Sequence, residues 1–147
     1  MGETCPISYK LVDEKVVRIN SILTAITVLS FFITSNKFVI VFLSVDFFIR
    51  GFIDPVYSPY SMLSKSLLRF SNNKPKLIDG SPKIFAAKLG FVFSSTIVLF
   101  AILNYHMIPI VIGILLILFA LLEGIFGYCV GCKIYTIIEK YKKTQHN

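Results

Sequence analysis

Charged residues are scarce in this chain, and tryptophan is absent. Asp, Glu, Lys and Arg make up 16% of the 147 residues, whereas hydrophobic residues make up 55% and the mean hydropathy is +0.75. A water-soluble domain carries roughly a quarter charged residues, so this composition excludes an ordinary soluble domain and predicts a lipid-embedded chain. Without tryptophan, tyrosine and phenylalanine must supply any aromatic belt at the membrane surface.

Nucleotide and nucleic-acid binding find no support in the sequence. It contains no glycine-rich loop of the kind that cradles phosphates. The net charge of +7 is of the sign that attracts nucleic acid, but in so apolar a chain the basic residues are the flanks that orient membrane helices. We therefore expect the lipid bilayer as a partner, and no nucleic acid.

Four apolar runs predict an all-α, four-helix membrane protein with a single domain over residues 1–147. At about 1.5 Å of rise per residue, such runs match a hydrocarbon core of roughly 30 Å, although the second run is slightly short. The predicted spans are residues 17–35, 38–53, 84–103 and 107–128. Tight turns at 35–37 and 104–106 make the spans of each pair antiparallel neighbours, which gives two helical hairpins.

The two predicted hairpins resemble each other. The pieces "VVRIN…VDFFIRGF" and "FAAKLG…LLEGIFGY" both have a basic residue early in the first helix, and an acidic residue and a glycine late in the second. This pattern indicates a duplication, although shared topology signals produce the same likeness.

The segment that connects the hairpins, residues 54–83, is polar and rich in proline. Within it, "SPYSMLSKSLLRF" places apolar residues on one helical face and Lys65 and Arg69 on another. That pattern predicts a short helix lying among the lipid headgroups between spans two and three. Packing of this helix against the spans is the alternative.

The basic residues are distributed very unevenly about the spans. Every Lys and Arg except Lys37 lies in the N-terminal segment, the 54–83 loop, the C-terminal tail or the helix ends beside them. The positive-inside rule makes that side cytoplasmic, and an even number of spans places both termini there. We therefore expect an inner (plasma) membrane protein with cytoplasmic termini.

The three cysteines, Cys5, Cys129 and Cys132, all fall on the predicted cytoplasmic side. A merely structural disulfide is disfavoured there, because cytoplasmic thiols are kept reduced. Three interpretations of the Cys-x-x-Cys pair stay open. The cysteines close a helix end as small apolar residues, or they bind a metal with Cys5 as third ligand and His146 or a partner as fourth. In the third interpretation they are reactive thiols at a helix that re-forms at Lys133.

Five charged residues are predicted to form a layer just beneath the cysteines, near the cytoplasmic helix ends. They are Arg18, Asp46, Arg50, Lys88 and Glu123. Asp46 and Arg50 are four residues apart and can pair on one helical face. Charges at this depth face other helices and pair, because an unpaired charge in lipid is costly. Such a layer tunes the thiol pKa values, or it only fixes the order of the helices.

Five segments of the chain resemble, in order, segments of the bacterial and archaeal membrane family called domain of unknown function 4395. They are "CPISYKLVDEKVVRIN", "VDFFIRGF", "YSPYSML", "PKIFAAKLG" and "LLEGIFGYCVGCKIY". The resemblance covers nearly the whole chain. It implies a small integral membrane protein with an N-terminal Cys-Pro, here Cys5-Pro6, and a C-terminal Cys-x-x-Cys, here Cys129 and Cys132. It implies no established activity.

Together these patterns favour a thiol–disulfide or sulfur-handling role. One cysteine of the Cys129–Cys132 pair would attack and the other resolve, with Cys5 as a third participant and a thioredoxin-like protein or sulfur carrier as partner. Disulfide-forming quinone reductases share this plan, but only by analogy, and no quinone signature or other cofactor motif is visible. The main alternative is a non-enzymatic scaffold or accessory subunit. A small transporter subunit is another, and it would have to form homo-oligomers to enclose a pathway.

Overall fold

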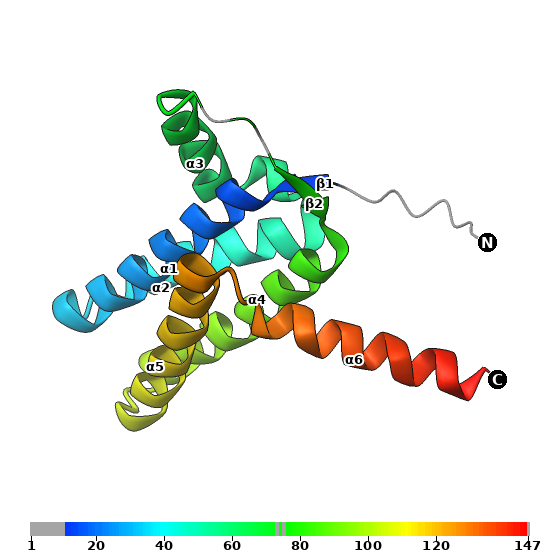
Figure 1. Ribbon diagram of the computed structural model, residues 1–147. Helices are drawn as coiled ribbons and strands as arrows, with labels where there is room; N and C mark the ends of the chain where they lie inside the picture. Colours follow the sequence, from blue (N-terminus) through cyan, green and yellow to red (C-terminus); the bar gives the residue numbers. More distant parts are fainter. Residues whose placement is uncertain (1–10, 73, 75, 147) are drawn as a thin grey trace.

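The computed structural model describes residues 11–72, 74 and 76–146, and most of them lie in helices (Figure 1). The predicted all-helical class is therefore confirmed. Four helices pack side by side: α1 (Glu14–Thr34), α2 (Lys37–Phe48), α4 (Ser81–Ile102) and α5 (Met107–Leu121). α1 contacts α2 and α5, and α4 contacts the same two helices, so the four close a ring.

Three segments in the described part of the chain are long and apolar enough to cross a membrane. They are Glu14–Thr34, Ser81–Ile102 and Met107–Phe126, of 21, 22 and 20 residues. These lengths match the roughly 20 residues that a hydrocarbon core requires. The predicted spans 17–35, 84–103 and 107–128 coincide with them to within a few residues. The predicted span 38–53 differs, because α2 ends at Phe48 and continues as a single π-helical turn, η1 (Ile49–Ile53).

The outward faces of the packed helices are apolar. Ile26, Leu29 and Ile33 of α1 and Leu118 of α5 expose about half or more of their surface, whereas Val28 of α1 is fully buried. The fully buried apolar residues of the other helices, Ile40, Leu43 and Ile97, belong to the same core cluster. So much exposed apolar surface suits a lipid environment and not water.

Both tight turns between the packed helices have the expected short form. Ser35 ends α1 in the left-handed conformation, with φ 53°, and Asn36 caps α2 by accepting a hydrogen bond from the Phe38 N–H at 3.0 Å. Asn104 has φ 63° in the turn between α4 and α5. Asparagine tolerates this region better than most residues with a Cβ, so the turn at 104–106 has a local cause.

The helix predicted within the connecting segment is α3 (Pro59–Arg69). It follows a 3-10 turn, η2 (Pro55–Tyr57), and it packs against α1. Its inward face is polar: Tyr60, Ser61 and Ser64 are buried, whereas the apolar residues Leu63, Leu67 and Phe70 point outward. The helix therefore packs against α1, through a polar contact that the sequence did not predict.

A small β-ladder joins the residues just before α1 to the end of the connecting segment, and the sequence did not predict it. β1 (Leu11–Asp13) pairs antiparallel with β2 (Leu77–Asp79). The ladder continues into the start of α1, where the Glu14 N–H donates to the Lys76 carbonyl at 2.9 Å and the two side chains form an ion pair at 2.9 Å. These contacts hold the beginning of α1 beside the beginning of α4.

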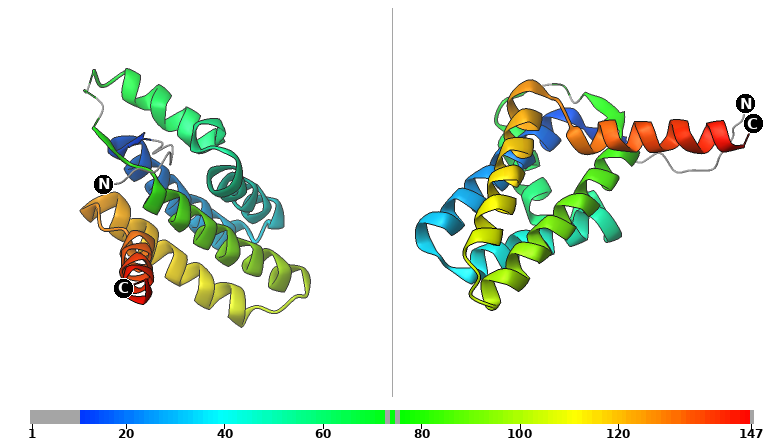
Figure 2. Two further views of the ribbon diagram at one scale, coloured as in Figure 1. Left: turned by 90° about the vertical axis from the view of Figure 1, so that its right-hand side faces the viewer. Right: turned by 90° about the horizontal axis from the view of Figure 1, so that it is seen from below.

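The last helix, α6 (Val130–Gln145), points in a different direction from the packed helices and projects away from them (Figure 2). In the left view it is seen end-on while the other helices are seen along their lengths. Its first turn rests on α4: a Cβ added to Gly131 would lie 2.7 Å from the Cβ of Ala86. Glycine therefore allows this close approach, which fixes the start of α6 against α4.

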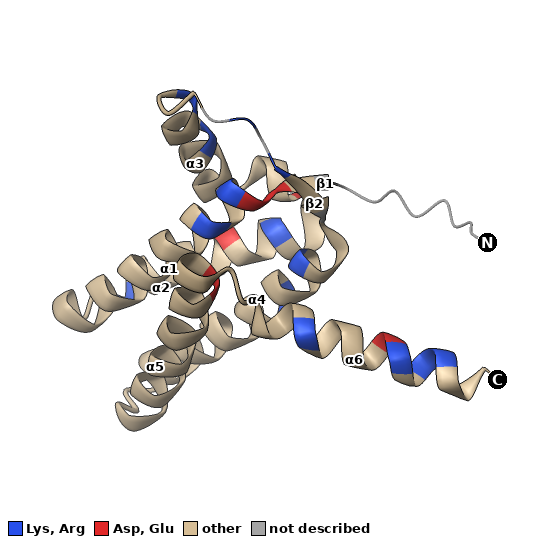
Figure 3. Ribbon diagram, viewed as in Figure 1, with Lys and Arg blue, Asp and Glu red and all other residues tan. Residues whose placement is uncertain are grey.

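Charged residues gather at one end of the packed helices (Figure 3). This end carries β1, β2 and the start of α6, whereas Lys37, the first residue of α2, is the only Lys or Arg among the described residues at the opposite end. The asymmetry read from the sequence is therefore an asymmetry in space. It is the distribution from which the positive-inside rule assigns orientation.

The resemblance between the two hairpins extends to a shared irregularity. α2 ends in η1, and α5 ends in a second π turn, η3 (Leu122–Phe126). Each turn contains a buried glycine, Gly51 or Gly124, beside a charged residue, Arg50 or Glu123. π turns inserted into helices are frequent at functional sites, and these two lie at the charged end of the molecule.

Candidate functional site

Cys129 and Cys132 begin α6. After η3 the chain turns at Gly127, which has φ +68°, and Cys129 then occupies the N-cap position. Its Sγ accepts a hydrogen bond from the backbone N–H of Cys132 at 3.2 Å. The pair therefore lies at a helix N-terminus, as one interpretation required. The helix begins at Val130 and not at Lys133, so Cys132 lies within its first turn.

The two cysteines are free thiols with different environments. Cys129 is buried, whereas Cys132 is partly exposed. A hydrogen bond from Cys129 and the nearby Lys83 ammonium lower the pKa of Cys132, against the opposing effect of burial. The same hydrogen bond and burial raise the pKa of Cys129. Because the two pKa values are shifted in opposite directions, Cys132 is the thiol that ionises first.

An ion pair lies beside the thiols. The Lys83 Nζ of α4 donates to the Glu123 Oε1 of η3 at 2.6 Å, and the Ser21 hydroxyl of α1 donates to the other carboxylate oxygen at 2.8 Å. The side chains of Lys83 and Glu123 are 15% and 17% exposed, so solvent screens this pair less than a surface pair. Its two charges act on the thiols in opposite directions: Lys83 favours the thiolate, whereas Glu123 disfavours it.

The sequence placed Lys88 in this layer, but the structure does not bring Lys88 to Glu123 and the thiols. Lys88 is exposed, and its ammonium lies over the Phe52 ring at 5.5 Å from the centroid. Lys83 takes its place because α4 and α5 are antiparallel, so the first turn of α4 is level with the last turn of α5. Lys88 lies about 7.5 Å further along the helix. Glu123 lies close to the end of its helix, so a partner on the antiparallel α4 must lie close to the start of α4, where Lys83 is.

Arg18 supports the end of the second hairpin without pairing with an acid in the contacts described. Its Nε donates to the Gly124 carbonyl at 3.2 Å, and its Nη2 donates to the Ile125 carbonyl at 2.6 Å. Carbonyl groups at a helix end lack partners within the helix and carry partial negative charge. Arg18 therefore satisfies the end of η3, just before the turn that leads to the cysteines.

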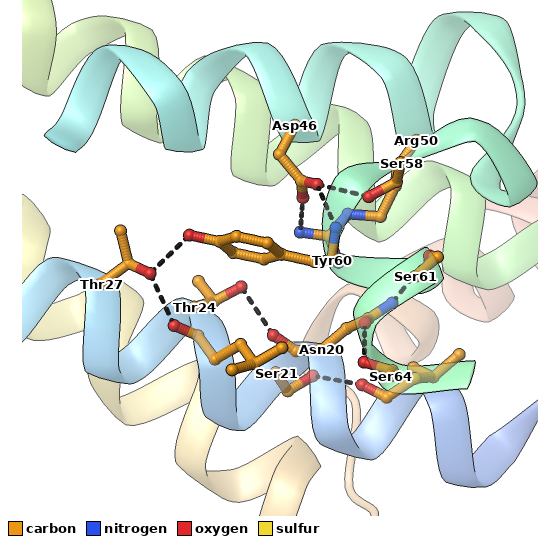
Figure 4. A network of polar contacts seen from close by, with 12 residues as sticks. Asn20, Ser21, Thr24, Thr27, Asp46, Arg50, Ser58, Tyr60, Ser61 and Ser64 are labelled. Atoms are coloured by element: carbon orange, nitrogen blue, oxygen red, sulfur yellow. Dashed lines mark hydrogen bonds and ion pairs between the residues drawn. The ribbon is translucent and has the colours of Figure 1, made fainter. Parts of the chain in front are cut away.

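Asp46 and Arg50 form a second centre, between α2 and α3 (Figure 4). They make the predicted ion pair, and Asp46 is fully buried. One carboxylate oxygen of Asp46 also accepts hydrogen bonds from the Ser58 hydroxyl and, at 3.2 Å, from the Tyr60 N–H. The Arg50 guanidinium lies over the Phe47 ring at 4.6 Å from its centroid. The carboxylate thus anchors the start of α3.

The same polar contact continues from α3 to α1, as Figure 4 shows. Tyr60 and Thr27 share a hydrogen bond between their hydroxyls, and the Asn20 amide donates to the Ser61 hydroxyl at 2.9 Å and accepts from that of Ser64. The sequence analysis missed this network. Its signal was the three-residue spacing of serines 58, 61 and 64, which places all three on one face of a helix. The predicted single charge layer is therefore two centres.

The metal interpretation finds no cluster in the described part of the chain. No group of three or more His, Cys, Asp or Glu side chains there is close enough to hold a metal ion. His146, named as a fourth ligand, follows the far end of α6, about 24 Å along the helix from the cysteines. Cys5, predicted as a third thiol or ligand, lies outside the described residues.

Two hollows meet at Cys129 and Lys83. A cavity of about 640 Å³ extends among α1, α4, α5 and the start of α6, and Glu123 and Arg50 also line it. A second hollow of about 510 Å³ is lined by both cysteines, Lys83 and Lys133. Cys129 lines both hollows, whereas Cys132 lines only the second. A reactant in the first hollow therefore meets Cys129 alone.

The chain was compared with protein-family models, curated proteins and solved structures. The model described as domain of unknown function (DUF4395) matches residues 12–140. The chain belongs to the DUF4395 family. No curated protein and no solved structure matches it. The DUF4395 match covers both hairpins and the Cys129–Cys132 pair. The family's description names no activity, so the function has to be inferred from the site.

Proposed function

We propose that this DUF4395 protein is a membrane-bound thiol–disulfide exchange protein whose reacting pair is Cys129 and Cys132. The observation that carries the proposal is their arrangement at the start of α6: the Cys129 Sγ accepts the Cys132 backbone N–H, and both thiols lie at a helix N-terminus in a hollow that Lys83 also lines. A helix N-terminus and an adjacent cation both stabilise a thiolate. Two cysteines that only closed a helix end would need neither the cation nor the hollow beside them.

The two thiols have separate roles in the proposed exchange. Cys132 is the thiol with the lower pKa and it is partly exposed, so it forms the mixed disulfide with the partner in the outer hollow. Cys129 is buried and adjacent, so its thiol closes or reopens the disulfide within the pair. The partner is a thioredoxin-like protein or a sulfur carrier, which offers a thiol, disulfide or persulfide that reacts by the same exchange.

We also propose that α2 and η1 complete a fourth crossing of the inner membrane. Together they hold 17 consecutive residues, from Lys37 to Ile53, which rise about 25 Å and reach the lower limit for a span. The basic end of the molecule would then face the cytoplasm, with both termini. This orientation places the cysteines in the compartment where thiol pairs are kept reduced and reactive.

Labelling from outside the cell tests this orientation. On intact cells, an impermeant maleimide should label a cysteine introduced at Asn36 or at Asn104, because both turns would face outward. It should leave Cys129 and Cys132 unlabelled until the membrane is permeabilised. Labelling of the native pair from outside contradicts the orientation and moves the site to the oxidising side of the membrane.

Substitutions in the Lys83–Glu123 ion pair test the proposed chemistry. Lys83→Gln should raise the pKa of Cys132 and slow its alkylation at pH 7, whereas Glu123→Gln should lower that pKa and speed alkylation, because the removed charges have opposite signs. Lys83→Arg, which keeps the charge, should restore the rate. The measurement is the rate of iodoacetamide labelling of Cys132 against pH in purified protein.

Two controls separate the alternatives to thiol chemistry. Free thiols counted with and without reductant show whether the pair cycles between dithiol and disulfide, and a chelator that releases thiols reveals a bound metal. If Lys83→Gln, Glu123→Gln and Lys83→Arg all react at the same rate, the neighbouring charges do not activate Cys132. The pair then only closes the helix, and the protein is a scaffold.

A further inference from the structure

The 640 Å³ cavity brings one thiol of the pair into contact with the apolar interior of the helices. We infer that this cavity binds a membrane quinone, which accepts the electrons of the Cys129–Cys132 dithiol. The inference rests on the proposed thiol–disulfide function and names its membrane-soluble substrate. The sequence carries no motif for a quinone, because the cavity is built by residues from several helices that are far apart along the chain.

The lining of the cavity is mostly apolar, with polar groups beside Cys129 and others on its α1 and α3 sides, among them Asn20, Thr24 and Ser61. Apolar side chains of α4 and α5 form its walls, among them Phe93, Leu116, Phe119 and Ala120. Such walls suit an isoprenoid chain and the faces of a quinone ring, since ligand sites are mostly apolar with a few placed polar groups. A water-soluble thiol reactant would have no need of this apolar space.

Hydrogen-bonding groups lie beside Cys129. Ser21, Lys83 and Glu123 line the cavity together with Cys129, and the first three are already linked to one another by hydrogen bonds. Arg50 lines it from another side, and its buried Nε–H has no hydrogen-bond acceptor among the described residues. A quinone presents two carbonyl oxygens that accept hydrogen bonds, and reduction delivers a proton to each.

The reaction balances without any other reactant. The S–H bonds of Cys129 and Cys132 break and one S–S bond forms, so the dithiol loses two electrons and two protons. The quinone takes up both electrons and both protons at its two carbonyl oxygens and leaves as quinol. A reduced dithiol partner then restores the pair through Cys132 in the outer hollow, which keeps the two half-reactions on opposite sides of Cys129.

Reduced protein in nanodiscs, mixed anaerobically with decylubiquinone, tests the inference. We expect one quinol per protein, measured by the ultraviolet absorbance change, with the loss of two titratable thiols. Ala120→Phe, which adds bulk at a buried position on the wall, should slow quinol formation about tenfold or more by filling the cavity. Leu118→Phe is the matched control, because Leu118 lies on the same helix with half of its surface exposed. It should react like the wild type.

Oxidation by diamide, a water-soluble reagent, distinguishes a failure of the quinone inference from a failure of the proposed thiol–disulfide function. Protein that loses both thiols to diamide but forms no quinol overturns the quinone inference and leaves thiol–disulfide exchange standing. Protein whose thiols do not react even with diamide overturns the proposed function itself. Quinol formed at the wild-type rate by Ala120→Phe shows that the quinone reacts elsewhere, which also overturns the inference.

A second measurement does not depend on any variant folding. A photoreactive azidoquinone added to the wild-type protein should label peptides that contain Leu116, Phe119 or Ala120, and unlabelled decylubiquinone should compete with it. Labelling confined to the outer faces of the helices, without competition, indicates general partitioning into the lipid and overturns the assigned cavity. A cavity occupied only by ordinary lipid gives that same result.

Discussion

Cys132→Ser is expected to abolish mixed-disulfide formation with a thioredoxin-like partner, whereas Cys129→Ser should make the mixed disulfide accumulate. Cys132 is the thiol that ionises first and it is partly exposed in the outer hollow, so without it the only thiol left there is the buried Cys129, whose pKa is raised. Without Cys129 the mixed disulfide still forms, but no neighbouring thiol resolves it. The complex is measured on non-reducing gels with a partner whose own resolving cysteine is replaced, and its linked peptides are identified by mass spectrometry.

The pH dependence of the same two variants gives an independent check. An unperturbed cysteine has a pKa of about 8.5, so only roughly 1% of it is thiolate at pH 6.5. In Cys129→Ser, Cys132 should alkylate with a midpoint below that reference, because a hydroxyl can still donate a hydrogen bond to the sulfur and Lys83 remains. In Cys132→Ser, Cys129 should alkylate with a midpoint above it, because burial persists. Ordinary midpoints for both thiols would falsify the assigned roles and favour a scaffold.

The apolar helices could be predicted from the sequence because length and hydropathy alone define a membrane span. Three spans coincide with helices of sufficient length, and the turns at Ser35 and Asn104 are where short polar residues interrupt the apolar runs. The end of α2 was harder to predict. The π turn η1 contains no proline. Its one glycine, Gly51, does not mark the turn either, because a glycine there is equally explained by close packing against Lys88.

The pairings among charged residues could be predicted only where both partners lie on one helix. Asp46 and Arg50 are four residues apart, so their contact follows from the helical repeat. Lys83 and Glu123 lie on different helices, and their contact depends on how far α4 extends beyond the turn before it. The sequence analysis accordingly placed Lys88 and not Lys83 in the charge layer, and it assigned no partner to Glu123.

The polar face of α3 was missed for a different reason. Hydrophobic periodicity identified the apolar face of this helix and led to the prediction that it lies among lipid headgroups, but periodicity does not say what the polar face contacts. Leu63 and Leu67 are accordingly exposed, while Ser61 and Ser64 pack on Asn20 of α1. The serine spacing was present in the sequence, but its partner Asn20 lies on another helix and could not be identified from it.

Asp46→Ala should cause the largest loss of stability among single changes in the helical core. Asp46 is fully buried and accepts hydrogen bonds from Ser58 and from the Tyr60 N–H, besides its ion pair with Arg50. Its loss leaves the guanidinium, only 12% exposed, without its counter-charge, which costs about 3–5 kcal/mol in comparable buried pairs. Unfolding in mixed detergent micelles, followed by circular dichroism, measures the change. Glu139→Ala on the exposed face of α6 is the control and should have little effect.

The double variant Asp46→Ala/Arg50→Ala decides whether the two charges act as a pair. Removing both leaves no uncompensated charge, so the double variant should be more stable than Asp46→Ala alone. Asp46→Asn should fall between the wild type and Asp46→Ala, because the amide oxygen still accepts from the Tyr60 N–H while the negative charge is lost. If the two alanine substitutions are simply additive, Asp46 and Arg50 do not interact. The anchor of α3 would then consist of the hydrogen bonds from Ser58 and Tyr60 alone.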